Sequence, residues 1–418
     1  MRSRAVSETW RAEARTLTVS DFFAELPRHA FTFLHGDGRW VMLAEDPLAI
    51  QEHPGHVAFH FERSGPMPPI LPDLFGHATY EFGYGLDPAL PGVPPPVDGL
   101  PDFQLSLHKT LRLYDRKEGI LYSAERCLER ELEPRLHGMG AGHFEARKRG
   151  DSDDAASYQG KVQRIREGIA QGDVYQVNLT RQEHWGYTGD LAHFAQRLQI
   201  VNPAPYSALV AEPGWAIVSS SPESFFRIDQ SRIRTRPIKG TAPRGLDSLA
   251  DLHLREGLWS SPKNRSELAM IVDLLRNDLT RICRIPSVTV EAFPTLESYA
   301  NVHHLVAEVS GDLLPDLSLE AVFQAMFPGG SITGCPKLAA MGLIRELEPC
   351  PRRIYTGALG WCRADFQQAE FSIPIRTAWA TGGELHFGVG GGVVWDSDPR
   401  EEYEETVHKG RSLVQCLS

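Results

Sequence analysis

Cysteine is scarce in this sequence of 418 residues, and long apolar runs are missing. The six cysteines, at positions 127, 283, 335, 350, 362 and 416, include no CxxC pair, which disfavours a disulfide framework or a zinc site. No stretch approaches the roughly 18 consecutive apolar residues of a membrane-spanning helix, and the first residues lack the apolar core of a signal peptide. These absences predict a cytoplasmic protein without membrane partners.

Positive charge is also in short supply. Lys and Arg number 43 against 54 for Asp and Glu, so the net charge is −11. A nucleic-acid partner is not expected, because phosphate contacts need clustered Lys and Arg. What is present, 42% hydrophobic and 23% charged residues, is typical of a globular protein with a sizeable core.

A Gly-, Arg- and Asp-rich segment at 138–154 is the best candidate for a linker, and it divides residues 1–150 from residues 151–418. The first part is predicted to be mostly β. Strands are expected at 31–34, 40–44, 110–114, 208–210, 216–219, 354–361, 371–380 and 384–389, and helices at 158–171 and 266–279. Because strands and helices do not alternate regularly, we predict α+β layers rather than a parallel doubly wound sheet.

The densest cluster of chemical groups lies near the C-terminal end. A Gly-rich turn is expected at 388–392, and a helix is expected to start at 398–399, where Asp precedes Pro. On that helix Glu402, Glu405 and Lys409 would share one face. Acidic residues are favoured at any helix N-terminus, but a Gly loop beside two carboxylates and a lysine could also hold an anion and a divalent cation.

Three further residues have reactive or ligating side chains in suggestive places. Glu267 opens an amphipathic helix, where it is either an edge residue or an oxygen ligand of Mg²⁺. Lys239 is either a surface charge or, if buried, a nucleophile with a lowered pKa. Glu223 in apolar surroundings would keep its proton longer and serve as a general acid.

Taken together, the motifs resemble those of the chorismate-utilising enzymes. They occur in the family's order and read DVYQVNLT (173–180), SSSPES (219–224), PIKGT (237–241), ELAMIVDLLRNDL (267–279), NVHHL (301–305), PGGSITGCPK (328–337), RIYTGALGW (353–361), PIRTA (374–378) and the Gly-rich C-terminal block. The resemblance implies an α+β fold, a large sandwich of two twisted antiparallel sheets with outer helices, in which residues 1–150 contribute strands to the same sandwich. Residues 151–418 would form the chorismate-binding catalytic part.

The resemblance also implies the roles of individual residues. The Mg²⁺ ligands, which would grip the ring carboxylate of chorismate, are Glu267, Glu405 and Glu402. The pocket for that carboxylate would be completed by Gly390, Gly392 and Lys409. Tyr355 and Arg376 would clamp the enolpyruvyl carboxylate. His304 matches the family's active-site histidine, and Gly240 and Thr241 would line the ring.

Two positions favour one subgroup, the aminodeoxychorismate synthases. Gln176 stands where the water-using members have a lysine base, and Lys239 stands where anthranilate synthases have alanine. In the favoured subgroup this lysine is thought to attack ring C2 while a glutamic acid at the position of Glu223 protonates the leaving hydroxyl. The alternatives are component I of anthranilate synthase and a non-catalytic chorismate-binding protein. Because the sequence contains no glutaminase segment, we expect ammonia from a separate glutamine amidotransferase subunit in a heterodimer.

Overall fold

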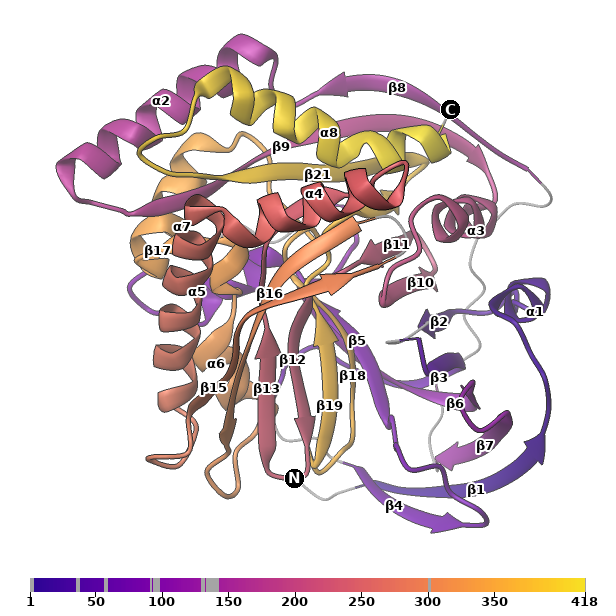
Figure 1. Ribbon diagram of the computed structural model, residues 1–418. Coiled ribbons are helices and arrows are strands. Elements are labelled where there is room, and N and C mark those ends of the chain that lie inside the picture. Colours follow the sequence, from indigo (N-terminus) through magenta and orange to yellow (C-terminus); the bar gives the residue numbers. More distant parts are fainter. Residues whose placement is uncertain are drawn as a thin grey trace.

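A computed structural model gives the fold (Figure 1) and describes residues 4–34, 38–55, 59–90, 92, 98–128, 132, 143–299 and 302–417. The helices in these ranges are α1 (Val19–Ala24), α2 (Ala155–Gln171), α3 (Leu191–Val201), α4 (Ser248–Ser260), α5 (Pro262–Thr280), α6 (Leu319–Met326), α7 (Lys337–Leu347) and α8 (Pro399–Leu417). Two 3₁₀ turns are η1 (Tyr80–Gly85) and η2 (Gly330–Ile332). No helix in the described ranges is both long and apolar enough to cross a membrane.

The strands before residue 150 are β1 (Arg4–Ala14), β2 (Phe31–Leu34), β3 (Trp40–Gln51), β4 (Phe59–Ser64), β5 (Leu74–Ala78), β6 (Phe103–Asp115), β7 (Ile120–Leu128) and β8 (Phe144–Asp151, which ends just beyond it). Those that follow are β9 (Gln176–Gly189), β10 (Tyr206–Glu212), β11 (Trp215–Ser221), β12 (Ser224–Asp229), β13 (Arg232–Arg236), β14 (Ile238–Pro243), β15 (Thr289–Ser298), β16 (Val302–Asp312), β17 (Gly334–Cys335), β18 (Ala358–Cys362), β19 (Gln368–Ser372), β20 (Thr377–Thr381) and β21 (Glu384–Val393).

These strands form two sheet layers that share strand β6. The first layer runs in the order β8–β9–β21–β20–β11–β10–β2–β3–β6–β7–β1–β4. The second runs β6–β5–β18–β19–β12–β13–β16, with β14 and β15 also paired to β16. Each of these ladders is antiparallel except the parallel pair β1–β4. The predicted α+β class with antiparallel layers is confirmed, and the two sheets are one hydrogen-bonded network.

Alternation of side chains along the strands builds the layers. On β10, Leu209 and Ala211 pack in a core with residues of α3 and α8, whereas Ala208 and Val210 face a second core shared with strands of the other layer. Successive strand residues point to opposite faces, so one short strand serves both cores. Strands from the two sides of residue 150 also pair directly, β2 with β10 and β5 with β18. The boundary at residue 150 itself stays a prediction.

Helices cover the outer faces, as predicted. Figure 1 shows α2 and α8 lying across β9 and β21, and α4 and α5 beside β16. Helix α8 begins where the sequence predicts, because Oδ1 of Asp398 accepts hydrogen bonds from the backbone N–H groups of Arg400 and Glu401. Helix α5 starts at Pro262 after the cap residue Ser261 and buries one apolar stripe against the sheet.

Several predicted elements differ from the structure. Residues 388–392 are not a turn but belong to β21, which stays paired with β9 to its end. Of the predicted linker, 138–142 lies outside the described residues, and most of the rest is β8, paired with β9. Of the strand predicted at 354–361, residues 354–357 form a turn and only the rest belongs to β18, whereas the strand predicted at 371–380 is divided into β19 and β20. Thr356 and Arg376 in these breaks have positive φ angles of 61° and 52°, and such residues leave the extended conformation.

Candidate active site

Strand β14 carries three candidate residues in succession, Lys239, Gly240 and Thr241. Gly240 has a φ of +80°, a conformation that glycine adopts without strain. A Cβ on Gly240 would lie 2.8 Å from Cγ of Asn264 and 2.9 Å from Cδ1 of Leu258. Glycine therefore lets helices α4 and α5 approach closely beside the candidate nucleophile.

His304 lies beside Thr241 on the neighbouring strand β16. The strand register pairs the two residues, and Nδ1 of His304 is 2.9 Å from Oγ1 of Thr241. Burial, and next the charge of Arg376, lower the pKa of His304 to about 4. The imidazole is therefore neutral at physiological pH, when it can donate or accept a hydrogen bond.

Glu223 and Lys239 meet on opposite sides of one residue, Ser331 in η2. Oε1 of Glu223 accepts a hydrogen bond of 2.8 Å from the Ser331 hydroxyl. Nζ of Lys239 donates a bond of 3.1 Å to the Ser331 carbonyl. Glu223 immediately precedes β12 and is only 4% exposed, whereas Lys239 is partly buried. The structure therefore brings the predicted acid and the predicted nucleophile together around Ser331.

The surroundings shift both groups towards the forms that their predicted roles need. Burial raises the pKa of Glu223, opposed by the Ser331 hydrogen bond and by the charge of Lys239. Burial lowers the pKa of Lys239, opposed by the carboxylates of Glu267 and Glu223. A higher pKa favours the neutral acid and a lower pKa favours the neutral amine.

The glycines of β21 lie against three charged residues of α8. Nζ of Lys409 is 2.5 Å from Oε1 of Glu405 and donates a bond of 3.0 Å to the Gly390 carbonyl. Glu402 accepts a bond of 2.6 Å from the Ser397 hydroxyl through Oε1. The predicted face of Glu402, Glu405 and Lys409 therefore points at the strand.

The two carboxylates of α8 form a site that suits a cation. A Cβ on Gly391 would lie 3.1 Å from Oε2 of Glu402 and 3.4 Å from Oε1 of Glu405, so glycine leaves the two carboxylates more room than any other residue would. Oε2 of Glu402 is buried without a hydrogen-bond partner among the described protein groups. Burial raises the pKa of Glu402, and the charge of Glu405 raises it further. An unpartnered carboxylate oxygen beside a second carboxylate fits a hard divalent cation.

Glu267 does not join that pair. Within the described ranges, no three His, Cys, Asp or Glu side chains lie close enough together to hold a metal ion. Glu267 instead acts on Lys239, whose pKa it raises more than any other charge does. The three carboxylate ligands therefore stay a prediction, and of the three only Glu402 and Glu405 lie side by side in the structure.

Gln176 lies at the start of β9, and its side-chain amide lies beside Gly392 of β21, whose register partner is Asn178. The Gln176 side chain is fully buried, and neither its amide nitrogen nor its oxygen has a partner among the described protein groups. A Cβ on Gly392 would lie 2.6 Å from that nitrogen, so glycine makes room for the amide. A buried amide without partners is unfavourable by roughly 1–3 kcal/mol, which favours a polar ligand beside Gln176 and Gly392.

Tyr355 lies in the turn before β18, and Arg376 lies in the break between β19 and β20. The Tyr355 ring packs on Gly388, where a Cβ would lie 2.4 Å from a ring carbon, and burial raises the Tyr355 pKa to about 12. Nη1 of Arg376 donates to Oδ1 of Asn202 at 3.0 Å. Burial is the sole cause that lowers the pKa of Arg376, and no carboxylate of the described residues acts on it measurably. A half-buried guanidinium with a neutral partner suits an anionic ligand.

Comparison with known proteins identifies the family. A family model described as "chorismate binding enzyme" matches residues 29–415. The chain belongs to this family.

Relatives of this chorismate-binding enzyme carry out more than one reaction. It is 38% identical to aminodeoxychorismate synthase component 1 of Bacillus subtilis (strain 168) over 69% of this chain and 59% of the relative. It is 42% identical to an anthranilate synthase component 1 of Haloarcula marismortui over 62% of this chain and 53% of the relative. The match therefore spans little more than half the length of these relatives.

The menaquinone-specific isochorismate synthase of Escherichia coli has the same fold. The two structures align with a TM-score of 0.79 and 17% identity, covering 100% of this chain and 96% of that one. At this identity the likeness shows the fold alone. The family, but not the reaction, follows from the comparisons.

Sequence reasoning missed the residues that hold the predicted ones in place. Ser331 joins the acid to the lysine, Asn202 holds Arg376, and the Thr180 side chain lowers the pKa of Tyr355 against the larger effect of burial. Ser331 and Thr180 both lie inside motifs that carried the family resemblance, so a signal existed for them. Asn202 lies in none of those motifs, and its role follows only from the fold.

Proposed function

We propose that this chain is the chorismate-converting component of an aminodeoxychorismate synthase. It would make 4-amino-4-deoxychorismate from chorismate and ammonia, for the p-aminobenzoate branch of folate biosynthesis. The observation that carries the proposal is the pairing of a buried Glu223 with a partly buried Lys239, hydrogen-bonded to the hydroxyl and to the carbonyl of Ser331 respectively. A desolvated amine next to a carboxyl group with a raised pKa is a workable covalent pair.

In the proposed reaction, the neutral amine of Lys239 bonds to ring C2 while the C4–O bond breaks. Glu223 gives its proton to the departing hydroxyl, which leaves as water. Ammonia then bonds to C4 as the C2–N bond breaks, and Lys239 leaves as a neutral amine. The new ammonium group returns one proton to Glu223, so both residues end in their starting forms.

The substrate's carboxylates match the cationic groups at the two ends of the cluster. Arg376, whose guanidinium has a neutral partner, and Tyr355 would bind the enolpyruvyl carboxylate. Lys409, with backbone groups of Gly390 and Gly392, would hold the ring carboxylate. Two fixed contacts at opposite ends of a rigid substrate would orient C2 towards Lys239.

Mg²⁺ would be held by Glu402 and Glu405, with Glu267 as the third proposed ligand. Bound there, it would neutralise the negative charge of the ring carboxylate. The unpartnered oxygen of Glu402 and the room left by Gly391 support this assignment.

Glu405→Gln should raise the Mg²⁺ concentration needed for half-maximal activity, because a neutral amide is a poorer ligand for a hard cation. Glu267→Gln should do the same. The measurement is a titration of Mg²⁺ against activity in each variant, with Glu404→Gln, an exposed neighbour on α8, as the matched control. Wild-type midpoints in both test variants would mean that the metal lies elsewhere.

Ammonia would be supplied by a glutamine amidotransferase subunit in a heterodimer. The name "component 1" of the B. subtilis relative supports a second component. Purified chain should therefore form product from chorismate and ammonium, increasingly at alkaline pH where more free NH₃ is present, but not from glutamine. Product formation is followed with each donor and no other protein present. Robust turnover with glutamine alone would contradict the two-subunit proposal.

Anthranilate synthase component I is the second candidate, favoured by the 42% identity to the Haloarcula relative. Lys239 speaks against it, because the resemblance associates alanine at this position with anthranilate formation. A non-catalytic chorismate-binding protein would have no need of a buried acid and a partly buried amine in contact with one residue. The cytoplasmic location stays a prediction.

A further inference from the structure

Among the described residues, Ser331 is the one whose side chain and backbone form hydrogen bonds to both proposed reacting groups, Glu223 and Lys239. Its hydroxyl donates to Glu223 at 2.8 Å, and its carbonyl accepts from Lys239 at 3.1 Å. The same carbonyl also accepts a bond of 3.1 Å from the side-chain amide of Asn178. Ser331 is 6% exposed, so little solvent is available to replace these bonds.

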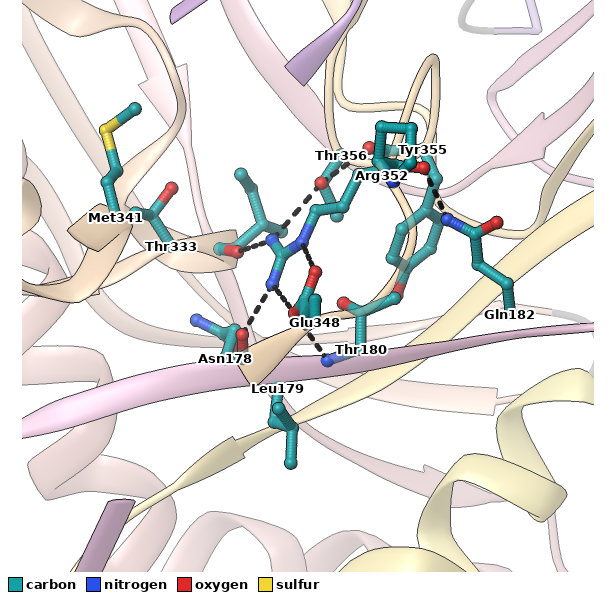
Figure 2. Close-up of polar contacts among 12 residues, drawn as sticks. Asn178, Leu179, Thr180, Gln182, Thr333, Met341, Glu348, Arg352, Tyr355 and Thr356 are labelled. Carbon is teal, nitrogen blue, oxygen red and sulfur yellow. Dashed lines mark hydrogen bonds and ion pairs between the residues drawn. The ribbon is translucent and has the colours of Figure 1, made fainter. Parts of the chain in front are cut away.

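The carbonyl of Ile332, the residue after Ser331, is bound by a buried arginine network (Figure 2). Arg352 is 1% exposed and donates to the Ile332 carbonyl at 3.0 Å and to the Asn178 carbonyl at 2.6 Å. Glu348 receives two further bonds from Arg352, at 2.6 and 2.8 Å. A planar guanidinium with this many fixed partners holds the segment rigidly.

The network also reaches the proposed carboxylate clamp. Oε1 of Glu348 accepts a bond of 2.8 Å from the backbone N–H of Thr180, and the backbone N–H of Tyr355 donates to the Arg352 carbonyl at 3.1 Å. The Ser331 segment and the Tyr355 clamp are therefore anchored to one ion pair, Arg352 with Glu348.

We propose that Ser331 is a positioning residue for the acid: its hydroxyl aims the Glu223 carboxyl group, while its carbonyl keeps Lys239 from pairing directly with that group. This rests on the proposed function. A direct ion pair of Lys239 with Glu223 would fix both residues in charged forms that can neither attack nor donate. Binding the two through different atoms of one rigid residue keeps them close and allows the neutral forms.

Several charged and polar groups besides Ser331 influence the pKa of Glu223. Lys239 from β14 and Lys409 from α8 face the carboxylate and favour its charged form, as does the backbone N–H of Ile238. Tyr355, held neutral by its raised pKa, faces it from the loop before β18. The Ser331 hydroxyl is the largest influence that lowers the pKa of Glu223, so its removal should raise that pKa.

Ser331→Ala tests the proposal in two independent readouts. First, infrared titration of the resting protein, with Glu223→Gln used to assign the carboxyl band, should show Glu223 titrating at higher pH than in the wild type. Second, kcat with ammonium should fall on the order of 10- to 100-fold, with a smaller change in KM for chorismate. With free NH₃ held constant, the alkaline limb of kcat should move to higher pH, because Glu223 stays protonated longer.

Thr333→Val is the matched control, since it removes a buried hydroxyl of the same segment that donates to the Gly329 carbonyl. It should lower the thermal midpoint without moving either pH profile. A wild-type Glu223 titration in Ser331→Ala, or a loss of kcat without that shift, would overturn the proposal. The infrared titration does not require turnover, so it tests the role of Ser331 separately from the proposed function. If the titration of Glu223 shifts but the protein makes no aminodeoxychorismate, Ser331 still positions Glu223 and only the proposed reaction is rejected.

Discussion

Lys239→Ala should lower the rate of aminodeoxychorismate formation by about 10³-fold or more, because the covalent route through C2 is lost. Any remaining product should be anthranilate. The expectation follows from the position of Lys239, whose pKa is lowered by burial and whose Nζ is held beside Glu223 by a bond of 3.1 Å to the Ser331 carbonyl. The measurement is kcat with chorismate, Mg²⁺ and saturating ammonium, with products separated and identified by mass.

Two further variants separate the nucleophile from its charge and from folding. Lys239→Arg keeps a positive charge but supplies no neutral amine, so it should be as inactive as the alanine variant. Lys161→Ala removes another half-buried lysine, whose ion-pair partner is Asp153, and should keep near-wild-type kcat. Near-wild-type aminodeoxychorismate formation in either Lys239 variant would eliminate the covalent mechanism.

Glu223→Gln should reduce kcat by roughly 10²- to 10⁴-fold, the usual contribution of a positioned general acid. Glutamine keeps the shape and accepts the Ser331 hydrogen bond, but it has no proton for the departing hydroxyl. Protonated Glu223 is lost as pH rises through its raised pKa, so the wild-type alkaline limb should be absent from the variant. The pH profile of kcat at constant free NH₃ measures this.

Glu183→Gln is the control for the loss of a buried carboxylate. Glu183 is 5% exposed, close to the 4% of Glu223, and it pairs with Arg181 at 3.2 Å and with Lys148 at 3.1 Å. Its replacement should lower stability and leave the pH profile of kcat unchanged. If Glu223→Gln behaves like Glu183→Gln, then Glu223 is not the acid.

The local sequence predicted those elements whose residues carry strong local signals. Asp398 followed by Pro399 marks a helix start, and α8 begins there. The predicted strand at 31–34 matches β2, and the helix expected at 158–171 lies within α2. Cap residues and apolar periodicity act within a few residues, so they are readable without the fold.

Tertiary contacts decided the elements that were predicted wrongly. Glycines at 388–392 suggest a turn by propensity, but pairing with β9 and the close approach of α8 keep them in β21. The breaks at Thr356 and Arg376 depend on positive φ angles. Threonine and arginine rarely adopt such angles, so the sequence does not predict them. These same breaks present Tyr355 and Arg376.

In the candidate site, too, some features could be predicted from the sequence and others depend on the fold. Lys239, Glu223 and Lys409 are charged residues in recognisable motifs, so their proximity could be expected from the resemblance. The role of Ser331 could not, since serine is common and only the fold places its two polar groups between two reacting residues. Nor does the sequence reveal that Gln176 is buried without a partner.

Product identity is the most direct test of the proposed function. Purified chain is incubated with chorismate, Mg²⁺ and ammonium, the product is identified by mass and absorbance, and pyruvate is assayed in the same sample. Aminodeoxychorismate synthase activity should yield 4-amino-4-deoxychorismate, which keeps its enolpyruvyl group, and therefore no pyruvate. Anthranilate with one pyruvate per turnover would contradict the account and favour the anthranilate synthase reaction instead.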